Sequence, residues 1–284
     1  MKYFLKGLFV FILCGIGQSL SAQESIIFEA GLRPKMVYKT KQQLITQNLL
    51  QYRGDSLMLA NLEQAGIENP QESVDTITNS SLTYTGNAQG ANYPLQMKIT
   101  ESDNYDLPAG ALLFGEVQRG IPVFDSIANS NMDEATATAV LKGVSALIKN
   151  TQVPPTALKV GESFSHSVPM EIPIGPSVFV VDIVTEYTLI DVQNGIANLN
   201  LDQVIVMNTT IEGYEMTANG TGKGTATYSV GSRFLTGMNL ELDMTLEMEI
   251  QGISIRVGMK SKSRQELELL EAADFPEGLI NLEN

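Results

Sequence analysis

The most constraining feature of this sequence is an unbroken alternation of apolar and polar side chains from Met238 to Ile250. A period of two residues places the apolar side chains on one face of a β-strand and the polar ones on the other. After Gln251-Gly252 the alternation resumes at Ile253 and continues to Met259. A glycine between two alternating segments favours a tight hairpin. The sequence therefore predicts two long antiparallel strands with one dry face and one wet face.

A loop made of Gln251 and Gly252 alone would fix the register of this hairpin. The wet face would then pair Glu247 with Arg256, Asp243 with Lys260, Glu241 with Lys262, and Asn239 with Arg264. The dry face would pair Ile250 with Ile253, Met248 with Ile255, Leu246 with Val257, and Met244 with Met259. A slip by one residue would spoil both faces, so we expect this register.

A second hairpin is predicted upstream, between the alternating segments 179–189 and 197–207. Its loop is predicted to be Gln193-Asn194-Gly195, with Gly195 in the left-handed conformation. This loop would pair Leu189 with Leu199, Ile183 with Ile205, and Val181 with Met207, but also Glu186 with Asp202. The last pair brings like charges together, which counts against the register. Residues 178–184 are apolar on both faces except at Asp182, so we expect this stretch to be covered on both sides.

Five further segments are predicted to be extended, namely 36–52, 80–84, 95–101, 163–172 and 225–234. The glycine-rich stretch Gly220-Thr221-Gly222-Lys223-Gly224 is predicted to be a flexible turn before the last of them. It does not match a phosphate-binding loop, because Gly224 stands where that pattern requires Ser or Thr after Gly-Lys.

One strong helix is predicted over residues 131–150, with Asn131 as its N-cap and Glu134 completing a capping box. Its apolar residues recur at spacings of three and four: Ala137, Val140, Leu141, Val144, Leu147 and Ile148. Such a stripe needs an apolar partner, and the dry faces of the two hairpins supply one. We therefore expect a mainly β (α+β) fold, a large curved antiparallel sheet or half-barrel wrapped around this helix. A weaker helix is predicted over 56–65.

The first 22 residues have the pattern of a secretory signal peptide, with Lys2 and Lys6 before an apolar run and Ala22 at the expected cleavage point. Cleavage there predicts a periplasmic or secreted protein with a single β-rich domain over 23–270 and a C-terminal tail over 271–284. Cys14 is the only cysteine and would be removed with the leader. A lipoprotein anchored through Cys14 is disfavoured, because Leu13 is not the small residue that lipidation needs before the cysteine.

The chain is acidic, with a formal net charge of −14. Nucleic acids and anionic membrane surfaces bind clustered Lys and Arg, so the charge argues against a nucleic-acid partner and for no more than peripheral contact with a membrane. Solubility is the simplest reason for the acidity.

Several segments together resemble a family of uncharacterised secreted proteins from Gram-negative envelopes. They are the stretch from Pro155 to Phe164 with Lys159-Val160-Gly161-Glu162, the stretch 187–197, and the Gly220-x-Gly222-x-Gly224 pattern before the long strands. The expected sheet-around-helix arrangement is also similar to the half-barrels of lipoprotein-carrier and lipoprotein-localisation factors. That similarity implies a lipid or another apolar ligand in the concavity of the sheet. None of the lipid-contacting residues of those proteins can be matched in this sequence.

The sequence contains no recognisable catalytic or metal-binding constellation. His166 is the only histidine, and no Ser-His-Asp arrangement is evident around it. Zinc sites built from several His or Cys ligands are excluded by number. The acidic residues between Glu241 and Glu249 alternate on the wet face opposite basic ones, which is typical of a solvated sheet. We therefore expect a protein that is not an enzyme and that has no cofactor and no metal.

The methionine-rich dry face of the first hairpin is the candidate ligand-binding surface, comprising Leu242, Met244, Leu246, Met248, Ile255, Val257 and Met259. Methionine adapts to variable apolar shapes, which favours a pliable lining for a ligand. The simpler interpretation is core packing, which would make the chain a structural or protein-interaction module with a fully packed core. A third interpretation is an outer-membrane β-barrel, since alternating strands fit that too. The amphipathic helix and the polar C-terminal tail count against the barrel.

Overall fold

The structure is a computed structural model and describes residues 25–103, 105, 107–150, 153–174, 177–211, 214–250 and 253–271. The predicted signal peptide, Cys14 and residues 272–284 of the predicted tail lie outside the described residues. The last strand runs to Glu271, one residue into the segment predicted as the tail.

Most of the described chain is β-strand, in agreement with the predicted fold class. The elements in chain order are β1 (Ser25–Ala30), β2 (Met36–Arg53), α1 (Ser56–Gln64), β3 (Gln71–Thr85), β4 (Asn92–Ser102), β5 (Leu112–Gln118), β6 (Ile121–Ala128), α2 (Glu134–Asn150), β7 (Val153–Lys159), β8 (Ser163–Ile174), β9 (Ser177–Gln193), β10 (Ile196–Ile211), β11 (Tyr214–Ser229), β12 (Phe234–Ile250) and β13 (Ile253–Glu271). The five segments predicted to be extended fall on strands, although the last, 225–234, spans the turn from β11 to β12. The weaker helix predicted over 56–65 is α1.

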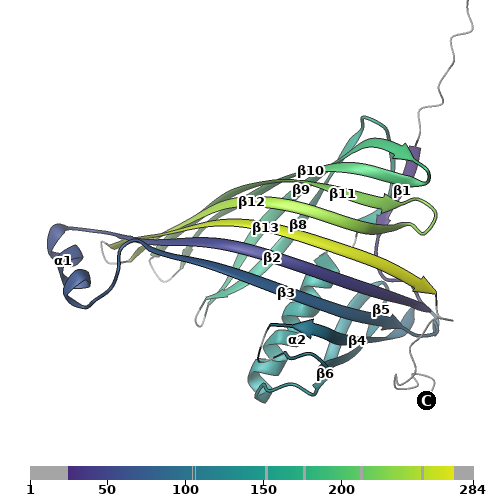
Figure 1. Cartoon of the computed structure of the whole chain (residues 1–284), viewed down its shortest axis with the longest axis horizontal. Helices are drawn as coiled ribbons and strands as arrows, with labels where there is room; N and C mark the ends of the chain where they lie inside the picture. Colours follow the sequence, from purple (N-terminus) through teal and green to yellow (C-terminus); the bar gives the residue numbers. More distant parts are fainter. Residues whose placement is uncertain are drawn as a thin grey trace, which may run out of the picture.

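Eleven strands form one antiparallel sheet in the order β6-β5-β4-β3-β2-β13-β12-β11-β10-β9-β8, and β1 pairs with β7 in a separate two-stranded sheet. The large sheet is strongly curved, with the long strands β2, β12 and β13 in front of β8 and β9, and it is not closed into a barrel (Figure 1). We call the face on which α2 and the β1–β7 pair lie the inner face, and the opposite one the outer face. The strand ends near β1 are the proximal end, and those near α1 are the distal end.

The predicted register of the β12–β13 hairpin is confirmed at every pair. Met244 lies opposite Met259 on the inner face, and Asp243 lies opposite Lys260 on the outer face. Three of the predicted charge pairs are ion pairs, Glu241–Lys262 at 2.8 Å, Glu247–Arg256 at 3.6 Å and Asp243–Lys260 at 3.7 Å. The alternation of the sequence therefore determines both the strands and their alignment.

The register of the β9–β10 hairpin is confirmed beyond its turn, but the predicted three-residue loop is wrong. Leu199 lies opposite Leu189 and Ile205 opposite Ile183. The loop itself is Asn194-Gly195, both with positive φ, and a bulge next to Leu189 absorbs the extra residue. The predicted Val181–Met207 pair lies outside the described pairs.

The unfavourable Glu186–Asp202 pair of this hairpin is present. Lys223 on the next strand, β11, lies 4.0 Å from the Asp202 carboxylate and offsets the repulsion. The expectation of cover on both sides of 178–184 is wrong at Val184, which lies on the outer face and is 37% exposed.

The glycine-rich stretch Gly220–Gly224 is not a turn but the middle of strand β11. Its glycines occupy alternate positions on the inner face, and β12 approaches them closely. A β-carbon on Gly224 would lie 2.1 Å from the backbone oxygen of Asn239, and one on Gly222 would lie 3.2 Å from the side chain of Gln203. Glycine is needed here for the close approach of neighbouring strands rather than for a chain reversal.

Helix α2 begins three residues later than predicted, and its N-cap is Asp133 instead of Asn131. The Asp133 carboxylate accepts a hydrogen bond of 2.8 Å from the backbone N–H of Thr136, and this bond lowers the pKa of Asp133. The Asn131 side chain instead donates to the backbone oxygen of Tyr105. Either residue type can cap a helix, so the spacing of Asn131 and Glu134, although it fits a capping box, does not decide the N-cap.

Helix α2 contacts both edge strands of the large sheet, β6 and β8 (Figure 1). Its residue Leu141 is buried with Leu95 of β4, Leu113 of β5 and Phe124 of β6. Ser145 of α2 accepts a hydrogen bond of 2.9 Å from the backbone N–H of Phe124 on the edge strand. The helix therefore covers β4–β6, whereas the sequence led us to expect it against the two long hairpins.

Candidate ligand-binding face

All seven residues predicted as ligand-binding lie on the inner face. The register that joins β12 to β13 continues to β2, where Val257 lies opposite Leu50 and Ile255 opposite Tyr52. Each of the seven side chains is half-buried, so none is sealed in the core. They lie in the distal half of the inner face, beyond the elements that cover the proximal half.

The proximal half of the inner face is covered by the small β1–β7 sheet. Phe28 of β1 and Leu158 of β7 are buried against Leu199 of β10 and Tyr228 of β11. The ring of Phe28 lies 4.9 Å from that of Tyr228 and 5.4 Å from that of Tyr187, centroid to centroid. At this end the β1–β7 sheet and the large sheet therefore form a β-sandwich with buried apolar side chains between them.

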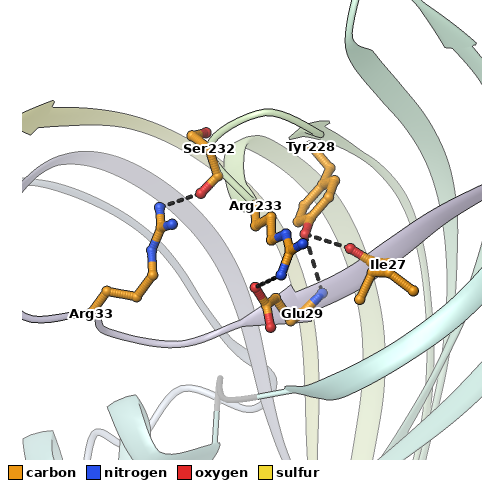
Figure 2. A network of polar contacts seen from close by, with 6 residues as sticks. All are labelled: Ile27, Glu29, Arg33, Tyr228, Ser232 and Arg233. Atoms are coloured by element: carbon orange, nitrogen blue, oxygen red, sulfur yellow. Dashed lines mark hydrogen bonds and ion pairs between the residues drawn. The ribbon is translucent and has the colours of Figure 1, made fainter.

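Polar contacts hold β1 to the turn between β11 and β12 (Figure 2). The hydroxyl of Tyr228 donates a hydrogen bond of 2.9 Å to the backbone oxygen of Ile27 and accepts one of 3.3 Å from the backbone N–H of Glu29. The Glu29 carboxylate lies 3.6 Å from the guanidinium of Arg233, and the side chain of Arg33 donates to the backbone oxygen of Ser232. Burial raises the pKa of Tyr228, consistent with a neutral hydroxyl in this network.

The distal half of the inner face has a different composition. Its buried cluster comprises Val181, Ile205, Met216 and Ala218, with Leu242, Met244, Leu246 and Met248 of β12 packed against it. All of these residues belong to β9–β12, and among the side chains that the structure describes none from α2, β1 or β7 joins them. The three predicted residues of β13, Ile255, Val257 and Met259, are outside this cluster and remain half-buried.

The described hollows do not form an enclosed apolar cavity over this surface. One, of about 430 Å³, lies along β11–β13 and β2 and is lined by outward-facing side chains such as Lys223, Asp243 and Lys260. Leu242 is the predicted residue that borders it. The other, of about 240 Å³, lies farther towards the proximal end and is bordered by Met238, Asn239 and Arg264. The candidate surface is therefore an open face of the sheet.

His166 lies on strand β8, as predicted. It faces Thr185 of β9 on the inner face and is half-buried. Among the described residues no group of three or more His, Cys, Asp or Glu side chains is arranged to hold a metal ion. The described helices include none that is long and apolar enough to cross a membrane.

Two features that shape this face were not predicted from the sequence. The β1–β7 sheet covers the proximal half of the inner face, and the β5–β6 hairpin supplies the surface on which α2 packs. The β5–β6 turn could have been found, because Arg119-Gly120 joins two apolar segments and glycine is common in two-residue turns. In the structure both residues have positive φ.

Comparison with known proteins places the chain in no family. No family model matches the sequence, and no curated protein matches it. Weakly similar solved structures include the attachment invasion locus protein Ail of Yersinia pestis, with 5% identity, coverage of 80% of this chain and 97% of that chain, and a TM-score of 0.15. The type II secretion secretin XcpQ of Pseudomonas aeruginosa has 7% identity, 94% and 64% coverage, and a TM-score of 0.20.

The protein OccK8 (OprE) of Pseudomonas aeruginosa is similar at 7% identity, with coverage of 85% of this chain and 100% of that chain and a TM-score of 0.20. TM-scores this low carry no argument about the fold or the function of this chain. None of the three is described as a lipoprotein carrier or localisation factor. The likeness to those half-barrels therefore remains a prediction from the sequence.

Proposed function

We propose that this chain is a non-catalytic, exported protein of the bacterial envelope that binds a lipid or another apolar ligand on the distal inner face. The observation that carries the proposal is the contrast between the two halves of that face. The proximal half is filled by β1–β7, whereas the apolar side chains of the distal half are half-buried on an open sheet.

The chemistry of the distal surface favours an apolar ligand. Leu246, Met248, Ile255 and Val257 form neighbouring pairs across β12 and β13. A contiguous apolar surface of this kind on a soluble protein is usually a binding site. The flexible side chains of Met244, Met248 and Met259 can adapt to chains of different shape.

Export and the absence of catalysis are proposed from the sequence. The pattern of residues 1–22 supports a periplasmic or secreted location. The lone His166 and the lack of any cysteine beyond Cys14 support a protein without a catalytic centre, metal or cofactor. The acidic net charge supports partners other than nucleic acid, and contact with a membrane that is peripheral at most.

A structural or protein-interaction module is the second candidate. It is favoured by the packing of Leu242, Met244, Leu246 and Met248 against the buried cluster of β9–β11, since these side chains already have apolar neighbours. In that case the half-buried residues of β13 would contact another protein instead of a ligand.

Uptake of an environment-sensitive apolar dye by the purified protein distinguishes these candidates. We expect the wild type to bind the dye and Val257→Glu to weaken binding at least about 10-fold, because a carboxylate on the inner face cannot be solvated beside the dye. Asn239→Glu adds the same side chain at an exposed outer position opposite Arg264 and serves as the matched control. Absence of dye uptake by the wild type, with no lipid in its organic extract, would favour the interaction module.

A further inference from the structure

A row of polar, uncharged side chains crosses the inner face between its two halves. Successive strand pairings align His166 of β8, Thr185 of β9, Gln203 of β10 and Gly222 of β11. The same row continues through Leu242 of β12 to Ser261 of β13 and Thr46 of β2. We call the side chains of His166, Thr185, Gln203, Ser261 and Thr46 the polar row.

The polar row is organised at its centre. The Gln203 side-chain N–H donates a hydrogen bond of 2.9 Å to the hydroxyl of Thr185, which is only 7% exposed. The Gln203 amide oxygen lies 3.2 Å from the position that a β-carbon on Gly222 would occupy. The glycine therefore leaves space beside the amide that any other residue would fill.

In the paired stretches of the seven strands that the polar row crosses, no Lys or Arg occupies an inner position. Strand pairing assigns every Lys and Arg within the paired stretches of β2 and β8–β13 to outer positions, and every Asp and Glu to outer positions, to the bulge of β9 or, for Glu271, to the proximal end of β13. The nearest inner-face charge is Asp75 on β3, next to Thr46 of the row, and its carboxylate accepts a hydrogen bond from the Asn48 side chain. An anionic group placed on the row would therefore have no Lys or Arg partner at the inner positions of these seven strands.

The apolar surface beyond the polar row is long and narrow. Along β12 it extends from Leu242 to Met248. These six steps along a strand correspond to about 20 Å. Met216 of β11 and Met259 of β13 flank it. An extended hydrocarbon chain fits this shape better than a compact ligand does.

From these observations we propose that the ligand is an uncharged single-chain amphiphile, with the chemistry of a long-chain monoacylglycerol. Its hydroxyl or ester oxygens would bond to the polar row, and its hydrocarbon chain would lie along the distal inner face. The charge pattern disfavours an anionic head group, because a carboxylate on the row would be desolvated without a Lys or Arg partner. This inference rests on the proposed function of the same face and specifies its ligand.

A ligand series on the full-length mature protein tests the inference. Affinities are measured for a long-chain monoacylglycerol, for an alkane of the same chain length, and for the corresponding fatty acid in its ionised form. We expect the monoacylglycerol to bind on the order of 10-fold more tightly than either of the others, as one or two hydrogen bonds would give. Equal affinities for monoacylglycerol and alkane, or tighter binding of the ionised fatty acid, would overturn the inference while the proposed function stands. Absence of binding by all three would overturn the proposed function as well.

A substitution in the polar row provides an independent test of its role in binding. Gln203→Leu removes the amide and should abolish the preference for monoacylglycerol over the alkane. Thr221→Val changes an exposed outer position on the neighbouring strand and should preserve the preference. A preference that survives Gln203→Leu would contradict the assignment of the polar row. If Gln203→Leu does not fold, the ligand series on the wild type decides alone.

Discussion

Tyr228 joins the short strand β1 to the inner face through both its ring and its hydroxyl. Its ring is fully buried against Phe28, and its hydroxyl bonds to two backbone groups of β1. Strand β1 is short and pairs only with β7, so these contacts are a large part of what fixes it on the sheet.

Replacement of Tyr228 by Phe should therefore destabilise the protein without changing its core volume much. Loss of the hydroxyl leaves the backbone oxygen of Ile27 without this donor, and we expect the free energy of unfolding to fall by about 1–3 kcal/mol. Urea unfolding followed by circular dichroism measures the change. Tyr105→Phe, at a side chain that is 78% exposed, is the matched control and should have little effect. Equal effects of the two substitutions would contradict the role given to the Tyr228 hydroxyl.

Buried tyrosines also predict a loss of stability in alkali. Burial, and secondarily the neighbouring Tyr38, raises the pKa of Tyr93 from 10.0 to about 12, and its hydroxyl donates a 2.7 Å bond to the backbone oxygen of Leu32. A raised pKa means that the folded state keeps a proton that the unfolded chain releases. This contribution is complete below pH 10.0 and is lost as the pH rises from there towards about 12.

Urea unfolding at a series of alkaline pH values checks this expectation. Stability should decline above pH 10 in the wild type and decline less steeply in Tyr93→Phe, which has no proton to lose at this position. Parallel pH profiles for the two proteins would show that Tyr93 does not contribute to the alkaline transition.

At the scale of elements, the strand pattern was predictable where one face is apolar and the other is charged. Met238–Ile250 and its partner strand meet both conditions, so the register of β12–β13 followed from the residues alone. The alternation of apolar and polar side chains gives no information at Gly220–Gly224, because glycine has no side chain that marks a face of the strand. Glycine is also common in turns. Only the close approach of β12 shows why glycine is required in the middle of a strand.

The packing of α2 could not be predicted from its apolar stripe. The stripe shows that the helix needs an apolar surface but not which one. The inner face offers three, one at each of its apolar clusters. The unpredicted strands β5 and β6 supply the surface through Leu113 and Phe124. As a result, the sequence predicts that the candidate residues on β12 and β13 share one apolar face, but it does not predict that the described part of the helix packs elsewhere.

Replacement of two glycines by alanine should change the stability of the protein in opposite directions. Gly224→Ala would place a β-carbon 2.1 Å from the backbone oxygen of Asn239, so β11 or β12 must shift, and we expect a loss of about 1–3 kcal/mol. Gly143→Ala lies at an exposed position of α2 with nothing within 4 Å, and it should stabilise by about 0.5–1 kcal/mol because alanine favours the helix. Thermal unfolding of both variants measures the signs. A neutral Gly224→Ala would show that the strands are not so closely packed.

At the scale of the whole molecule, charge and apolar surface are separated across one curved sheet. The outer face carries the ion pairs between β12 and β13, which are exposed and contribute about 0–1 kcal/mol each. Stability comes instead from three apolar clusters on the inner side, two of which are completed by β1–β7 and by α2. The third has no covering element among the described residues, and this asymmetry is the structural basis of the proposed binding face.

Methionine-methyl NMR spectra of the protein during titration with a long-chain alkane test this claim most directly. The twelve methionines provide few resolved signals, which can be assigned by Met→Leu substitution. We expect the methyl resonances of Met244, Met248 and Met259 to shift with added alkane, and that of Met97, which packs in the cluster covered by α2, to stay unchanged. Unchanged signals from the first three, or shifts confined to Met97, would contradict an accessible apolar surface on the distal inner face.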